Sequence, residues 1–171
     1  IVELQRDHNM SDIDYLIRDI RTARGYTKDI LSHVEQADWF RQPTEGVTHV
    51  AWQVGHLAVA QYGLAIKRVR GEKADDAELI SPEVRTLFSK GSRPVPEPAR
   101  YPTQEELRAV FDRVHQQVLD ESSDWSEELL DEATGEPPHP MFKTKREAIR
   151  WSVQHEFIHA GQIGLLRRLF G

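Results

Sequence analysis

Apolar side chains recur every three or four residues along most of this chain, which is the spacing that lines one face of an α-helix. This period predicts a first helix over residues 12–36 and a second over residues 48–70. It continues in a third helix that begins after Thr103 and in a last helix that begins after Thr144. The second stretch is apolar on most sides, which is typical of a helix buried among its neighbours.

The predicted helices begin beside residues that can accept hydrogen bonds from free backbone amides. Thr103 and Thr144 are each followed three residues later by Glu, which is the pattern of a capping box. Ser11 or Asp12 can cap the first helix, and Thr48 can cap the second. Four starts of this kind predict four long helices.

The stretches between these helices hold the residues that break helices. Loops are expected at residues 37–46, 91–102 and 122–142, and one short helix is expected from Pro82. No stretch shows the alternation of a β-strand. Because neither half has enough helices to close a core alone, we expect residues 1–171 to form a single all-α domain, a four-helix bundle. The long segment 71–102 leaves room for a crossover, so the second and third helices could run parallel.

Composition narrows the class of protein. The 171 residues are 39% hydrophobic and 29% charged, and their net charge of −6 argues against a nucleic-acid partner. No apolar run approaches the roughly 18 residues of a membrane helix, and the first residues lack the pattern of a signal peptide. We therefore expect a cytoplasmic protein with no membrane partner. The chain has no Cys, so any metal site must use His, Asp or Glu.

The last predicted helix carries the string His-Glu-x-x-His, from His155 to His159. Residues four apart lie on one face of a helix, so two imidazoles can share a metal ion. Eight histidines in 171 residues give about 0.4 such pairs by chance, so the spacing alone is weak support. Both histidines lie in the apolar stripe of the helix, where a buried imidazole needs a protein hydrogen bond or a metal. The helix by itself leaves both possibilities open.

A lasting metal site usually needs a third protein ligand. His56 is the preferred candidate, because it lies in the middle of the second predicted helix. Ala60 and Gly63 share its face, and such small residues leave space beside the imidazole. His49 lies about 10 Å further along the same helix axis, too far to share an ion with His56. His115 lies on the flank of the third predicted helix and is a weaker candidate.

The string His-Glu-x-x-His also occurs in zinc metalloproteases, where the Glu is a general base. The longer protease pattern needs Gly and His where this chain has Gln162 and Leu165. The other common arrangement needs a Glu ligand well downstream, but only residues 160–171 follow His159. No strand is expected that could bind an extended peptide, so we disfavour the protease interpretation.

The residues around these histidines resemble the DinB-like family, also called the YfiT-like or damage-inducible metalloenzyme family. The likeness lies in Ala-Trp-Gln-Val-Gly-His-Leu-Ala at residues 51–58 and in His-x-x-x-His-x-Gly-Gln-Ile from residue 155. It extends in helix order over nearly the whole chain. The resemblance implies an up-down-down-up four-helix bundle, often a homodimer. It also implies a divalent metal, commonly nickel or zinc, on His56, His155 and His159.

Three neutral imidazoles would leave such an ion with at least one open position, where a water could be acidified or a thiolate bound. The DinB-like family includes thiol-dependent transferases and an isomerase that use bacillithiol, mycothiol or glutathione. The resemblance therefore implies a metal-dependent transferase or hydrolase. Its partners would be a small-molecule substrate and a low-molecular-weight thiol.

Four neighbouring residues are further candidates for the site. Glu156 could be a general base, could orient a histidine, or could be a plain charge on the helix face. Gln162 shares the face of His159 and is expected to hydrogen-bond close to the ligands, with simple packing as the alternative. Trp52 and Trp151 lie next to the ligand faces, where they could line a pocket or serve as core residues.

A non-enzymatic function fits the same sequence. A stress-related metal-binding protein could use its ion only to tie the second helix to the last. An open coordination position that faces a cavity would favour an enzyme, whereas a fourth protein ligand would favour a structural metal.

Overall fold

The computed structural model of the chain describes residues 10–135 and 139–171, and these residues form an all-α fold. Within those ranges no strand is formed, and a single isolated bridge joins Ala133 to Thr144. The longer helices are α1 (Asp12–Ser32), α2 (Val50–Gln61), α6 (Gln104–Glu121) and α8 (Lys145–Phe170). The predicted all-α class is therefore confirmed.

Short helical segments connect the long helices. They are η1 (Gln36–Asp38), η2 (Tyr62–Lys67), α3 (Arg68–Arg70), α4 (Asp76–Leu79), α5 (Pro82–Leu87), η3 (Pro98–Arg100), η4 (Ser122–Asp124) and α7 (Glu127–Asp131). The η2 segment is a π-helix that continues α2 into α3 without a break. A π-helical turn inside an α-helix is rare and often lies at a functional site.

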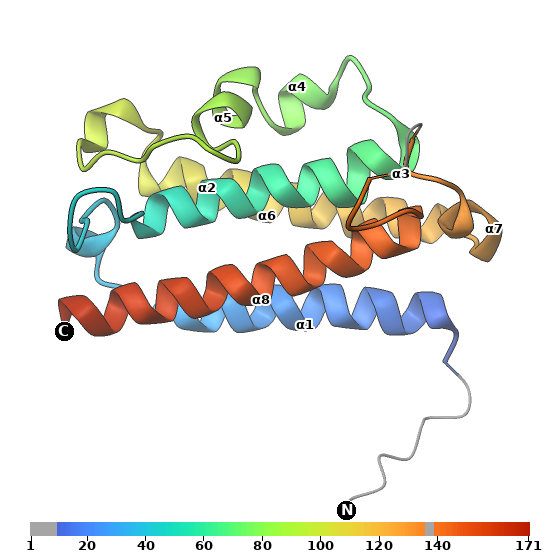
Figure 1. Cartoon of the computed structure of the whole chain (residues 1–171), viewed down its shortest axis with the longest axis horizontal. Helices are drawn as coiled ribbons and strands as arrows, with labels where there is room; N and C mark the ends of the chain where they lie inside the picture. Colours follow the sequence, from blue (N-terminus) through green and yellow to red (C-terminus); the bar gives the residue numbers. More distant parts are fainter. Residues whose placement is uncertain (1–9, 136–138) are drawn as a thin grey trace, which may run out of the picture.

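Four long helical rods lie side by side: α1, the continuous rod from α2 to α3, α6 and α8 (Figure 1). The α2 helix packs against both α6 and α8, and α8 also packs along α1. In Figure 1, α1 and α8 run from right to left, whereas α2 and α6 run from left to right. The segment with α4 and α5 lies over α2 (Figure 1).

Side chains at the starts of the helices satisfy the free amides as expected. Capping boxes begin α1 at Ser11, α6 at Thr103 and α8 at Thr144. The prediction for the second helix is wrong, because His49 rather than Thr48 is its cap. The Nδ1 atom of His49 accepts a hydrogen bond of 3.0 Å from the backbone amide of Trp52.

Two predicted boundaries differ from the structure. The first helix ends at Ser32 instead of residue 36, because the chain turns there to bury Trp39 completely. The loop expected over residues 122–142 contains α7, which Ser126 caps and which buries Leu130. In each case one apolar side chain, Trp39 or Leu130, reaches the core from a stretch that lacks the helical period.

The core lies between the four rods, and one close contact in it positions the site described below. A Cβ atom at Gly55 on α2 would lie 2.5 Å from the ring of Phe88, so only glycine lets this ring pack against the helix. Phe88 is completely buried and follows α5 directly. The crossover segment is thereby fixed against the middle of α2.

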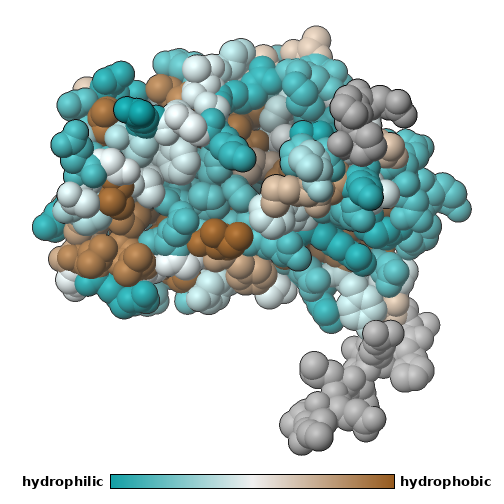
Figure 2. Space-filling model, in the orientation of Figure 1, coloured by the Kyte–Doolittle hydropathy of each residue, from teal (hydrophilic) through white to brown (hydrophobic). Residues whose placement is uncertain are grey.

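The outer surface is ordinary for a charged protein. The face drawn in Figure 2 is largely hydrophilic, and its hydrophobic residues form separate small groups. Among the helices that the structure describes, none combines the length and the apolar character needed to cross a lipid bilayer.

Candidate metal centre

Helices α2 and α8 bring His56, His155 and His159 together, as the sequence predicts. One ring nitrogen from each lies within 4.8 Å of the others. The ring centroids are 5.1 Å apart for His56 and His155, 4.8 Å for His56 and His159, and 4.3 Å for His155 and His159. We call these three residues the histidine cluster. It meets the first requirement of a metal site, which is the convergence of donor atoms on one point.

A backbone carbonyl sets the orientation of His56. Its Nδ1 donates a 2.8 Å hydrogen bond to the carbonyl oxygen of Phe88, and this bond leaves Nε2 as the atom that can bind a metal. The ring of Trp52 stacks on the imidazole at 4.6 Å and an angle of 8°. The indole of Trp52 is itself held, because its Nε1 donates to Ser92 Oγ at 2.8 Å.

A pair of amide side chains orients His159. Its Nδ1 is in a short hydrogen bond with Gln53 Oε1, and the amide nitrogen of Gln53 donates to Gln162 Oε1 at 2.8 Å. The Nε2 atom of His159 is thus left to face His155 Nε2, 3.1 Å away. Gln162 contacts His159 only through Gln53, a residue that helical spacing did not single out.

The cluster fits a divalent ion. Two nitrogens bound to one tetrahedral ion at 2.0–2.1 Å would lie about 3.3 Å apart, close to the 3.1 Å between His155 and His159. His155 Nδ1 is buried and has no hydrogen-bond partner among the residues that the structure describes. Neutral imidazoles have a lone pair to share, and the Nε2 atoms of His155 and His159 are hydrogen-bonded only to each other among the described residues, so an ion could replace that contact and bind all three rings.

Burial keeps the three imidazoles neutral. It lowers the pKa of His155 to about 4 and that of His159 to about 3, and it also lowers the pKa of His56. The charge of Lys90, and that of His56 whenever it is protonated, lower the pKa of His155 further. At pH 7 the protein therefore presents neutral ligands without first removing a proton, which favours metal binding.

All three histidines line one cleft with a volume of about 1280 Å³. Ala60 and Gly63 line it too, so the small residues on the face of His56 do leave the space that the sequence predicts. Trp151 lies in the wall of the cleft, whereas Trp52 lies behind His56 and is not part of that wall. The open side of the cluster therefore faces a space large enough for a small molecule.

Glu156 does not join the histidine cluster. Its carboxylate is buried and accepts a 2.7 Å hydrogen bond from Arg24 Nε, with a second contact of 3.3 Å to Nη2. The same guanidinium donates to Gln61 Oε1 at 2.7 Å and to the backbone carbonyl of Phe111. The amide of Gln61 continues to His115 Nδ1 at 3.3 Å. We call Arg24, Gln61, His115 and Glu156 the arginine cluster.

The other described histidines have separate places. His115 belongs to the arginine cluster, and His49 is buried as the cap of α2. His33 is exposed at the end of α1, and His139 stacks on Phe142 in the lining of the cleft. His8 lies outside the described residues. The histidine cluster is the only group of three or more potential metal ligands within the described part of the chain.

The fold and the site define an all-helical protein with three converging histidines that could hold a metal ion. The sequence profile of the DinB superfamily matches residues 19–163, so the chain belongs to the DinB superfamily. Its fold is similar to the crystal structure of a conserved protein from Enterococcus faecalis, with a TM-score of 0.69 and 15% identity. That likeness covers 94% of this chain and 97% of the other. No functionally curated protein matches the chain significantly.

Proposed function

We propose that this protein is a metal-dependent enzyme of the DinB superfamily that acts on a small molecule. One observation carries the proposal: His56, His155 and His159 converge in the wall of a cleft, and the described residues supply no fourth ligand. Three protein ligands with one side open are typical of a catalytic metal site, whereas structural sites are closed by four. Nickel or zinc suits three imidazoles.

The residues of the chain would do three things. His56, His155 and His159 would hold the ion, while the Phe88 carbonyl and Gln53 keep two of the rings in the ligating orientation. A divalent ion bound there supplies Lewis-acid chemistry, such as the activation of a water or a thiol. The cleft would bind the substrate beside the open side of the cluster.

The reaction class is a thiol-dependent transfer or a hydrolysis. The chain has no Cys, so a thiol would have to come from a low-molecular-weight cosubstrate in the cleft. The proposal includes an up-down-down-up bundle as scaffold, a homodimer as the assembly and a cytoplasmic location. A stable scaffold supports such chemistry because the ligands sit on helices rather than on loops.

A structural metal is the second candidate. The ligands come from two helices, so an ion would also cross-link α2 to α8 and stabilise the fold by binding. This function would need no substrate. It predicts a large rise in stability on metal loading and no turnover with any thiol or electrophile.

The first test is metal content. We expect about one divalent ion per chain in the purified protein, and loss of nearly all of it in His155→Ala and His159→Ala, measured by elemental analysis. His56→Ala should lose it as well. His33→Ala is the matched control, because His33 is exposed and away from the cleft. Retention of metal in His155→Ala or His159→Ala would contradict the site, and retention in His56→Ala would remove His56 from it.

The second test is turnover. Bacillithiol, mycothiol or glutathione is supplied with a panel of electrophiles, to metal-loaded and to chelated protein. We expect thiol consumption above the background rate only in the loaded protein. Hydrolysis of ester substrates without thiol is measured in parallel. No turnover in either assay, together with a metal fully ligated by protein groups, would favour the structural function.

A further inference from the structure

The charge of the cleft differs from the charge of the chain. The sequence has a net charge of −6, yet the described residues that line the cleft include five Lys or Arg and no Asp or Glu. These five are Lys67, Arg68, Arg70, Lys90 and Lys145. Charges of one sign in the low-dielectric walls of a cleft focus the electric field and attract ions of the opposite sign.

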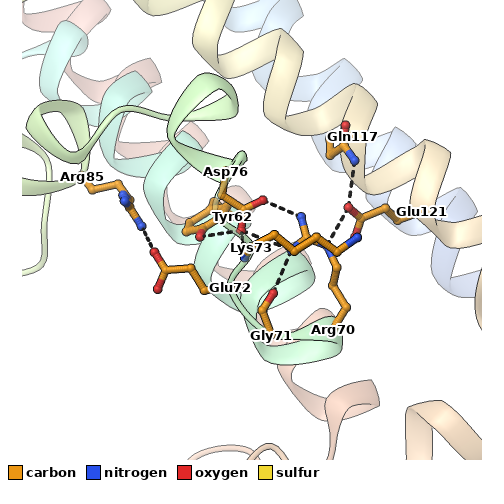
Figure 3. Close-up of polar contacts among 9 residues, drawn as sticks. All are labelled: Tyr62, Arg70, Gly71, Glu72, Lys73, Asp76, Arg85, Gln117 and Glu121. Atoms are coloured by element: carbon orange, nitrogen blue, oxygen red, sulfur yellow. Dashed lines mark hydrogen bonds and ion pairs between the residues drawn. The ribbon is translucent and has the colours of Figure 1, made fainter.

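Three of the five cations already have carboxylate partners. Arg70 binds Asp76 at 2.6 Å and Glu121 at 2.8 Å, in a network that also includes Tyr62 (Figure 3). Lys67 pairs with Glu72, and Lys145 pairs with Glu132 at 2.7 Å. These pairs fasten the crossover segment and the start of α8. The carboxylates largely neutralise the charges of these three cations.

Arg68 and Lys90 are different. Neither has a carboxylate within 4.0 Å among the residues that the structure describes. The guanidinium of Arg68 is half-buried and lies 4.9 Å from the ring centre of Phe142, a contact that orients it without using its hydrogen bonds. Lys90 follows Phe88 by two residues, so the contact that fixes Phe88 at His56 also keeps Lys90 close to the cluster.

Much of the rest of the lining is apolar. The apolar side chains in it include those of Val59, Leu64, Leu129, Met141 and Phe142. A ligand with an apolar body and one anionic group would match both features. A free guanidinium is well suited to a planar oxyanion, because its N–H groups can bind two oxygens at once.

We propose that the cleft binds an anionic small molecule, whose carboxylate or phosphate group is held by Arg68 while its apolar body extends toward the histidine cluster, where Lys90 adds positive charge. The inference rests on the proposed function, since it names the substrate class for the same cleft. Arg68 and Lys90 are then specificity-determining residues. They select the substrate by charge and take no part in metal binding.

The test compares ligands that share one apolar body and differ in the group at its end. Probes are 4-phenylbutanoate, its neutral amide and 3-phenylpropyl phosphate, titrated calorimetrically into metal-free and metal-loaded protein. We expect the carboxylate or the phosphate to bind about tenfold more tightly than the amide in both forms, with a preference that weakens at high salt. Whichever anion binds more tightly identifies the oxyanion that the cleft prefers.

Two variants and one control assign the effect. Arg68→Gln and Lys90→Gln should each reduce anion affinity several-fold, and the double variant should bind anion and amide alike. Arg21→Gln removes one positive charge from α1, outside the cleft, and should change nothing. Circular dichroism checks that each variant is folded.

The outcomes separate this inference from the proposed function. An equal affinity for anion and amide, or a preference that survives in the double variant, would overturn the inference whatever the metal content. Anion binding that appears only with metal and is unchanged by Arg68→Gln and Lys90→Gln would place the anion on the ion and would also overturn it. If the protein takes up no metal at all but still prefers the anion, the proposed function is refuted and this inference stands.

Discussion

Helix α8 contributes to two buried polar clusters through two residues that are adjacent in the sequence. His155 belongs to the histidine cluster, and Glu156 belongs to the arginine cluster. In the arginine cluster, Arg24 makes hydrogen bonds to Glu156, Gln61 and the Phe111 carbonyl and lies 3.3 Å from the Phe111 ring centre. In the histidine cluster, three nitrogens converge on a cleft, and His155 Nδ1 lacks a partner among the described residues.

The contrast shows how the role of a buried polar group can be inferred from its hydrogen-bond partners. A network whose members satisfy one another specifies the fold, because each member would cost free energy if its partner were lost. A set of ring nitrogens that converge on an open cleft, and whose only hydrogen bond among the described residues is the one between His155 Nε2 and His159 Nε2, is ready for a ligand. Burial alone does not tell the two apart, since His159 and Glu156 are both buried.

The largest expected effect tests the structural nature of the arginine cluster. Glu156→Gln leaves Arg24 buried without its counter-charge and should lower the free energy of unfolding by about 3–5 kcal/mol. Metal content should be unchanged, because Glu156 has no contact with the histidine cluster. The measurements are urea unfolding of the metal-free protein and elemental analysis of the folded protein.

A double variant sharpens this comparison. Arg24→Met combined with Glu156→Met should be less unstable than the sum of the two single changes, since each single change strands the other charge. His155→Gln serves as the contrast: it should remove metal but cost the metal-free protein far less stability. If Glu156→Gln instead abolished turnover and left stability and metal content intact, Glu156 would be a catalytic base.

The helix period and the caps allowed the fold to be predicted in outline. Thr103, Thr144 and the apolar stripes gave the long helices and their starts, because capping and periodicity are local properties of sequence. The short α7 and the cap at His49 were missed. Each depends on a residue whose role is decided by packing against distant parts of the chain.

The same division applies to the site. His56, His155 and His159 could be found from helical spacing and resemblance, since two share one helix face and one lies mid-helix. The residues that hold them could not, because the Phe88 carbonyl and Gln53 reach the histidines only in the folded chain. The place of Glu156 was left open, although one step along a helix turns the side chain by about 100° and here carries it into the other cluster.

An intermediate effect is expected where an orienting residue of the histidine cluster is removed. Gln53→Met deprives His159 Nδ1 of its partner and should weaken metal binding about 10–100-fold, as is typical of residues that orient a ligand. Competition with a chelator of known affinity measures the change.

Gln162→Met is the matched control for this effect. Gln162 acts on His159 only through Gln53, so its loss should weaken binding less. Unchanged metal affinity in Gln53→Met would show that packing alone orients His159, and the contrast between the two clusters would then rest on the convergence of the nitrogens.

The smallest expected effect concerns acid and the arginine cluster. Burial, helped by the charge of Arg24, lowers the pKa of His115 to about 3 from its ordinary 6.5, so the folded protein holds this imidazole neutral. Below about pH 6.5 the unfolded chain binds a proton at His115, whereas the folded chain does not. Proton binding therefore favours unfolding, and the free energy of unfolding falls progressively as the pH falls toward 3. His115→Gln should make the stability of the metal-free protein fall less steeply between pH 6.5 and 4.5, measured by urea unfolding.

Gln116→Met, at the exposed next position, removes no proton-binding group and should keep the wild-type slope. Parallel curves for His115→Gln and the wild type would show that His115 takes up its proton in the folded state as well. The arginine cluster would then tolerate a second cation, and its role as a closed, self-satisfying network would be lost.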